Sequence, residues 1–221
     1  MNEIMNFNDS KRIYPQVNAS THTFYLYEVG DPEDYIEWYE AMRKAGPHDT
    51  IYIHINSIGG RMSTAQQMLR CMNECQGTII ASVEGECASA ATLIFLAADG
   101  WEVSPHSIFM FHNYSGGVFG KGGEMYDRIE FEKKWAEALM REAYTDFLTE
   151  EEMTEMFLGK DQYFTSDEVM EKLNHRLDKR EKEKYKLEIA ATPLEVFEEE
   201  LKALKEDIAY KKKLEKQSNE K

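Results

Sequence analysis

The sequence has no apolar run that approaches the roughly 18 residues of a membrane-spanning helix. Its first residues, MNEIMNFNDSKR, are polar and charged where a secretory signal would carry an apolar core. Cysteine is scarce: Cys71, Cys75 and Cys87 make an odd number that does not suit a disulfide framework. These absences predict a reduced, cytoplasmic protein with no membrane partner.

Metal ligands and nucleotide-binding loops are missing too. Cys71 and Cys75 would share one helix face, but no partner ligands lie near them, so we interpret them as packing residues. The segment NYSGGVFGKGGEM holds five glycines yet lacks the GK[ST] ending of a P-loop. The sequence therefore predicts no metal and no cofactor.

Basic residues are few for the number of acidic ones. The chain has 26 Lys and Arg against 41 Asp and Glu, which gives a formal net charge of −15. Residues 176–221 hold 13 basic and 12 acidic residues, so the excess negative charge belongs to the rest of the chain. Because nucleic-acid binding needs a basic surface, we expect no nucleic-acid partner.

The residues that are present favour one α/β domain with additions at both ends. Strand-like segments (HTFYLYEV, TIYIHIN, TIIASVEG, SIFMFH) alternate with amphipathic ones (DPEDYIEWYEAMRKAG, MSTAQQMLRCMNECQG). This alternation predicts an α/β fold with parallel strand pairing. We expect an N-terminal arm at 1–20, a domain at 21–175 and a charged helical extension at 176–221.

Further helices are expected after the glycine-rich loop. A long charged helix is predicted from Tyr126 to about Leu148, followed by short helices in TEEEMTEMFLGKD and TSDEVMEKL, the second capped by Thr165 or Ser166. In the extension, Thr192 begins a capping box before a short apolar stripe that contains Leu194, Phe197, Leu201, Leu204 and Ile208. That stripe would dock on the body or a neighbouring subunit, or bind a dedicated partner.

The segment GECASAATLIFLAADG places Ser89 among small residues, between a predicted strand and a predicted helix. A hydroxyl there needs a partner, so Ser89 is either a helix cap or a nucleophile. A serine nucleophile requires a base, a group that orients the base, and N–H donors for the oxyanion. The free N–H groups at a helix start suit the last of these. Cys87 and Ala91 exclude the G-x-S-x-G elbow of the α/β-hydrolases.

His112 is the best-placed base among six histidines, because it ends a predicted strand beside a flexible loop. His54 lies in the middle of a strand and is interpreted as structural. The Gly-Gly turn in INSIGG would leave backbone N–H groups open to a ligand, although by itself it is a weak signal.

Four segments in order carry a resemblance to a known family. IYIHINSIGGRMSTAQQML, GECASAATLIFLAA, SIFMFHNYSGG and GKDQYFTSDEV resemble successive signatures of ClpP, the proteolytic subunit of the Clp protease. The resemblance covers about Thr50 to Leu173 and preserves the order Ser, His, Asp. It implies a ClpP/crotonase-like spiral of ββα units, with a protruding handle at about 113–148.

The resemblance also implies roles for individual residues. Ser89 would be the nucleophile, His112 the base and Asp161 the group that orients the base, while the N–H groups of Gly60 and Ala90 would form the oxyanion hole. The implied activity is that of a serine endopeptidase, which cuts protein or peptide substrates through an acyl-enzyme. The implied assembly is a homo-oligomeric ring chamber, a heptamer or double heptamer, with an AAA+ unfoldase as partner.

Several residues depart from the family pattern. Ile58 replaces a turn proline, Cys87 an alanine and Ala90 a methionine, and the arm and the extension have no counterpart in the common form. These departures put the unfoldase partner and the ring size in doubt and would suit a specialised, phage-type member. Two alternatives stay open: a catalytically silent ring or regulatory subunit, and a crotonase-like CoA-binding enzyme. Retention of all three triad positions argues against both.

Overall fold

The computed structural model describes residues 19–191 together with 202 and 205. The predicted capping box at Thr192, the apolar stripe that follows it and most of the predicted arm lie outside these residues. Contacts divide the chain into two units, Met1–Glu171 and Lys172–Lys221. The domain boundary expected after residue 175 stays a prediction.

The first unit contains one mixed sheet, which confirms the predicted α/β fold. Its strands lie in the order β1-β2-β3-β5-β6, and β4 also pairs with β3. All pairs are parallel except β5 with β6, which is antiparallel. The strands are β1 (Thr21–Leu26), β2 (Thr50–Ser57), β3 (Thr78–Ala88), β4 (Gly100–Val103), β5 (Ile108–Phe111) and β6 (Gln162–Thr165).

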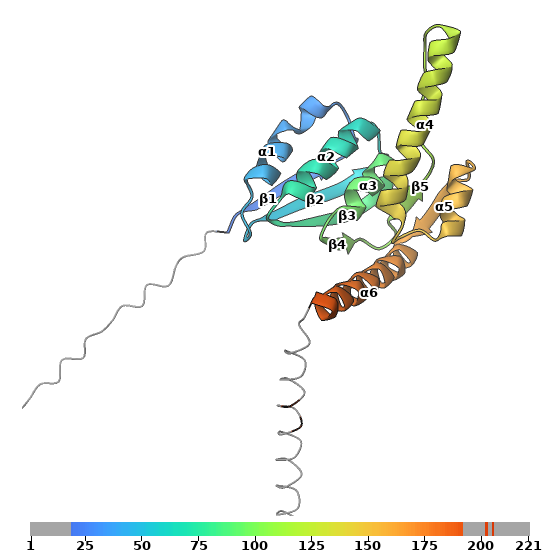
Figure 1. The fold of residues 1–221 in the computed structure, drawn as a ribbon. Coiled ribbons are helices and arrows are strands. Elements are labelled where there is room, and N and C mark those ends of the chain that lie inside the picture. The colour runs from blue at the N-terminus through green and yellow to red at the C-terminus, as the bar shows by residue number, and fades with distance from the viewer. Residues whose placement is uncertain (1–18, 192–201, 203–204, 206–221) are drawn as a thin grey trace, which may run out of the picture. The chain divides into compact units, whose positions relative to one another are not determined.

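Three helices cover one face of this sheet (Figure 1). They are α1 (Ile36–Lys44), which follows a 3-10 turn at Pro32–Tyr35, α2 (Met62–Glu74) and α3 (Ala90–Leu96). Alternate residues of β2 (Ile51, Ile53 and Ile55) are fully buried. The period-2 pattern of TIYIHIN therefore identified the buried face of a strand correctly.

Two short strands were absent from the sequence prediction. β4 and β6 have four residues each, too few to display a period. β6 also reverses the direction of pairing, since it runs antiparallel to β5. β5 also has four residues, but all of them are apolar (IFMF), whereas GWEV in β4 and QYFT in β6 each contain only two aromatic or apolar residues.

Three further helices follow the sheet strands: α4 (Gly122–Tyr144), α5 (Glu150–Phe157) and α6 (Ser166–Ala191). The predicted long helix is confirmed as α4, and its first half extends away from the sheet (Figure 1). The helix predicted in TSDEVMEKL is far longer than expected. Thr165 caps it, because Thr165 and Glu168 bond each other's backbone N–H groups. In the described part of the chain, no helix combines the length and apolar character needed to cross a bilayer.

Candidate active site

The carboxyl ends of two neighbouring strands bring Ser89 and His112 together. Ser89 follows β3 directly and His112 follows β5 directly, and these strands are parallel with Ala88 opposite Met110. The Ser89 N–H continues this pairing by donating to the Met110 carbonyl at 2.9 Å. Because parallel strands end at the same edge of a sheet, residues 23 positions apart become neighbours.

The Ser89 hydroxyl bonds a histidine instead of capping α3. Ser89 is the N-cap residue of α3, but its side chain makes no cap hydrogen bond. Its Oγ lies 2.6 Å from Nε2 of His112. The backbone of Ser89 has φ 55° and ψ −129°, which is strained for a residue with a Cβ. A strained serine in contact with an imidazole is typical of an exposed nucleophile and untypical of a cap.

The turn after β2 approaches the serine from the other side. Gly59 has φ +97°, and a Cβ added there would lie 2.5 Å from the Ser89 Cβ and 2.9 Å from the Ala90 nitrogen. Only glycine permits both this conformation and this approach. The Gly59 N–H donates to the Ser57 Oγ at 3.2 Å, which holds the turn. Gly59, the first glycine of INSIGG, was not among the predicted site residues, although the double-glycine turn was the signal for it.

Two backbone N–H groups remain open beside Ser89. Gly60 forms a parallel bridge with Val29, in which Val29 N–H bonds Gly59 and Arg61 N–H bonds Val29. The Gly60 N–H therefore points away from Val29, as alternate residues of a strand do. Ala90 begins α3, so its N–H has no partner inside the helix. Gly60, Ser89, Ala90 and His112 line one small cavity of about 40 Å³.

An aromatic cluster fixes the strand end that carries His112. The ring of Phe111, fully buried, lies between 5.2 and 5.7 Å from the rings of Tyr144, Phe147 and Phe164. These rings come from α4, the turn after it and β6. The following residue, Asn113, donates to the Phe157 carbonyl of α5 at 3.2 Å. Packing on both sides of His112 thus restricts the position of its backbone.

Asp161 directly precedes β6 and His112 directly follows β5, so both lie just beyond the last pair of these strands. The antiparallel pairing ends with Phe111 opposite Gln162, and one more step would place His112 opposite Asp161. Asp161 is exposed, and among the described residues no hydrogen bond joins it to His112. The structure thus brings four of the five predicted site residues to one cavity, and Asp161 is not among the residues that line it.

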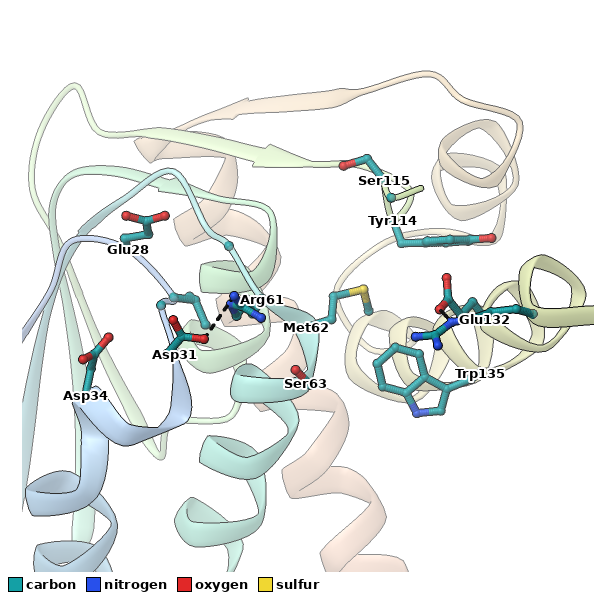
Figure 2. A pocket seen from close by; sticks show the side chains of 15 residues that line it. Glu28, Asp31, Asp34, Arg61, Met62, Ser63, Tyr114, Ser115, Glu132 and Trp135 are labelled. Atoms are coloured by element: carbon teal, nitrogen blue, oxygen red, sulfur yellow. Dashed lines mark hydrogen bonds and ion pairs between the residues drawn. The ribbon is translucent and has the colours of Figure 1, made fainter. Parts of the chain in front are cut away.

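A larger groove of about 720 Å³ adjoins this cavity and shares Gly60, Met62, Tyr114 and Ser115 with it. Figure 2 shows two walls, with acidic side chains near α1 on one side and Tyr114 and Trp135 on the other. The charged residues of the lining are Glu28, Asp31, Asp34, Arg61, Arg128 and Glu132. Two ion pairs form among them, Arg61–Asp31 at 3.1 Å and Arg128–Glu132 at 2.7 Å. The groove therefore has an excess of two negative charges.

Two other kinds of chemistry, a cysteine nucleophile and a metal site, have little support in the structure. Cys87 is fully buried, and burial strongly raises the pKa of its thiol, so it is a protonated packing residue and not a nucleophile. Cys71 is buried in α2 and also unpaired by disulfide. Across residues 19–191, 202 and 205, no three His, Cys, Asp or Glu side chains gather as metal ligands.

Comparison with protein-family models gives one match, the Clp protease model, over residues 10–172. The chain belongs to the Clp protease family. The match covers residues 10–20 of the predicted arm, the sheet and the start of α6, and it includes all five predicted site residues. None of the curated proteins matches the sequence. Clp protease membership makes this chain a peptidase by family, and the mixed α/β sheet agrees with the ClpP-like fold.

Several residues around the Clp protease site could not be found from sequence motifs. The small cavity is also lined by Leu93, Met140 and Tyr144. The Thr92 hydroxyl donates a hydrogen bond to the Ser89 carbonyl. In the sequence, Leu93 and Met140 belong to an apolar pattern with helical spacing. Such a pattern predicts that a side chain is buried, but not which cavity it lines. Tyr144 is 55 residues from Ser89 in the chain, and only the fold reveals that both line this cavity.

Proposed function

We propose that this chain is a serine endopeptidase in which Ser89, His112 and Asp161 form the catalytic triad. The observation that carries the proposal is the 2.6 Å contact between the Ser89 Oγ and the His112 Nε2 at a strained turn. In the Nδ1-protonated tautomer, Nε2 accepts the Ser89 proton, which makes the hydroxyl oxygen nucleophilic.

The cleavage then proceeds in two balanced steps. The Ser89 oxygen attacks the scissile carbonyl carbon, and His112 takes the hydroxyl proton. The N–H groups of Gly60 and Ala90 stabilise the oxyanion, since both are open beside the serine. When the C–N bond breaks, His112 returns the proton to the leaving amine. Water then attacks the acyl carbon while His112 takes its proton, and when the bond between that carbon and the Ser89 oxygen breaks, His112 returns the proton to Ser89 and the product acid leaves.

In the proposed triad, Asp161 acts on the second ring nitrogen of His112, Nδ1. The β5–β6 register ends one step before His112 and Asp161. If it continued to them, their Cβ atoms would lie about 4.5–5.5 Å apart, and an Asp161 rotamer could then direct the carboxylate to Nδ1. There it would fix the tautomer and stabilise the imidazolium. A catalytically silent ring subunit is the alternative, and the outward-facing Asp161 is the observation that favours it.

We further propose that the active form is a homo-oligomeric ring. The first half of α4 and the loop before it expose large apolar side chains: Phe119, Tyr126, Ile129 and Phe131. Several exposed large apolar side chains on one segment are typical of a protein contact. Substrate would enter the groove as an extended segment next to Tyr114 and Ser115. The excess negative charge there favours segments without clustered acidic residues. A cytoplasmic location, an AAA+ unfoldase partner and a phage-type origin remain predictions from sequence.

Hydrolysis of a fluorogenic peptide library by wild-type protein and by Ser89→Ala tests this function. We expect turnover in the wild type and none in Ser89→Ala at unchanged native mass. Ser104→Ala, in the loop between β4 and β5, is the matched control and should keep wild-type turnover. Equal turnover in Ser89→Ala and wild type would remove the assignment, and absence of turnover in assembled wild type would favour the silent subunit.

A further inference from the structure

A chain of three hydrogen-bonding groups ends on the carbonyl oxygen of Ser89. That oxygen accepts the Thr92 N–H at 2.9 Å and the Thr92 hydroxyl at 2.7 Å. The Thr92 Oγ1 also lies 2.7 Å from the hydroxyl oxygen of Tyr144. A carbonyl can only accept, so Thr92 gives its single proton to Ser89 and must accept from Tyr144. The order of donation is therefore Tyr144 to Thr92 to Ser89.

This relay is enclosed in the protein. Thr92 is 0% exposed and Tyr144 is 2% exposed. Burial strongly raises the pKa of the Tyr144 hydroxyl, so it stays a neutral donor. Hydrogen bonds in such a low-dielectric interior are strong and costly to leave unmade. The relay also joins two elements, since Tyr144 ends α4 while Thr92 lies in the first turn of α3.

The carbonyl that the relay holds belongs to the same peptide unit as the Ala90 N–H. A trans peptide is planar, and its C=O and N–H point in opposite directions. When Thr92 holds the Ser89 oxygen on the α3 side, the Ala90 N–H must point the other way. Ala90 and Ser89 both line the small cavity with His112, so that direction leads toward the reacting groups. The Ser89 N–H is fixed separately by Met110, which leaves this peptide plane as the part that needs support.

We infer that Tyr144 and Thr92 are positioning residues that aim the Ala90 N–H and the Ser89 side chain for catalysis. Neither hydroxyl touches the substrate in this account; both act through the orientation of the Ser89–Ala90 peptide. The inference rests on the proposed function, because it assigns the Ala90 N–H to the oxyanion hole. A purely packing role for the pair would support α3 against α4 without affecting the transition state.

Kinetics of conservative variants separate these two roles. Tyr144→Phe and Thr92→Val each remove one hydroxyl with little change of shape, and each should lower kcat about tenfold with KM within about twofold. The affinity for a peptide aldehyde, which forms a tetrahedral oxyanion on the serine, should fall by the same factor. Because one relay is broken in all cases, the double variant should lose little more than either single variant. Thr92→Ser retains the hydroxyl and should stay within about threefold of wild type.

Tyr39→Phe provides the matched control, since the buried Tyr39 hydroxyl has no hydrogen-bond partner in the described structure. It should keep wild-type kcat and aldehyde affinity. Wild-type kcat and aldehyde affinity in both Tyr144→Phe and Thr92→Val would overturn the inference. So would a loss in Thr92→Ser as large as that in Thr92→Val. Equal native mass of all variants excludes an effect through assembly.

A crystal structure of Thr92→Val tests the inference even where no peptide is cleaved. We expect the Ser89–Ala90 peptide to rotate away from ψ −129° and the Ser89–His112 contact to lengthen beyond 2.6 Å. An unchanged peptide plane and contact would overturn the positioning role. Failure of the proposed function is a separate result, because it appears as wild-type protein with no Ser89-dependent turnover. If Thr92→Val does not fold, Tyr144→Phe gives the same structural reading.

Discussion

His112 and Asp161 lie one step beyond the last pair of β5 and β6, yet their side chains are not hydrogen-bonded. Asp161 is exposed, and the proposed triad requires its carboxylate to reach the His112 imidazole. If the register continued to these two residues, they would be close enough for a rotamer change to join them. The proposed mechanism therefore requires the Asp161 carboxylate, and a substitution at this position tests it.

Asp161→Asn should lower kcat by about 10³–10⁴-fold while KM changes little, because an amide cannot stabilise the imidazolium and selects the wrong tautomer. Steady-state kinetics with a fluorogenic peptide measure this. Asp167→Asn, in the first turn of α6, is the matched control and should behave as wild type. An Asp161→Asn enzyme with wild-type kcat would exclude Asp161 from the triad.

Gly59→Ala should damage both stability and turnover. The added Cβ would lie 2.5 Å from the Ser89 Cβ, in a backbone with φ +97°, so either the turn or the serine must move. We expect the free energy of unfolding to fall by about 2–5 kcal/mol and turnover by about 100-fold or more. Urea unfolding and peptide hydrolysis provide the two measurements. Gly100→Ala is the control, since its Cβ would meet Ile80 at an ordinary 3.8 Å. Equal behaviour of the two variants would contradict the close packing of the turn on Ser89.

The buried Tyr39 hydroxyl has no hydrogen-bond partner in the described structure, so we expect its removal to stabilise the protein. Tyr39→Phe should raise the free energy of unfolding by about 1 kcal/mol, because it removes a buried group without a partner in the described structure. Burial also raises the pKa of Tyr39 to about 12. The folded state therefore holds this proton more tightly than the unfolded state, and that part of the stability is lost as the pH rises from about 10 to 12.

Urea unfolding at pH 8 and pH 11 measures both effects. Tyr39→Phe should lose less stability than wild type between the two values, since it lacks one of the tyrosines that titrate. The exposed Tyr163 serves as control, and Tyr163→Phe should match the wild type at both values. A Tyr39→Phe protein less stable than wild type at pH 8 would mean that the hydroxyl has a favourable partner.

Substitutions in the first half of α4 test the proposed homo-oligomeric assembly. Ile129→Asp combined with Phe131→Asp places charge where a neighbouring subunit would bury apolar side chains, so native mass spectrometry should report a smaller particle. Asp127→Asn, exposed on the same helix, should leave the mass unchanged. A wild type that is already monomeric, or a double variant of unchanged mass, would contradict the proposed ring.

Sequence motifs predicted four residues that the structure brings to one cavity, Gly60, Ser89, Ala90 and His112, because each lies at a turn or strand end with a recognisable local pattern. A serine at a strand end, a histidine at the next strand end and a double-glycine turn each carry a recognisable signal, and parallel pairing brings them together. The residues that we infer to position the site could not be predicted, because their sequence shows no motif and they are far apart in the chain. Thr92 and Tyr144 look like ordinary helix residues, and their contact spans 52 positions. The strands β4 and β6 were missed because each is short and only half apolar, unlike the equally short but fully apolar β5, and β6 matters most because Asp161 directly precedes it.

Labelling with a fluorophosphonate, followed by peptide mapping in a mass spectrometer, tests the central claim most directly. A serine activated by His112 should react once per subunit, with the adduct on Ser89, and His112→Ala should abolish the reaction while the protein stays folded. An unlabelled assembled wild type, or an adduct on a different serine, would contradict the account.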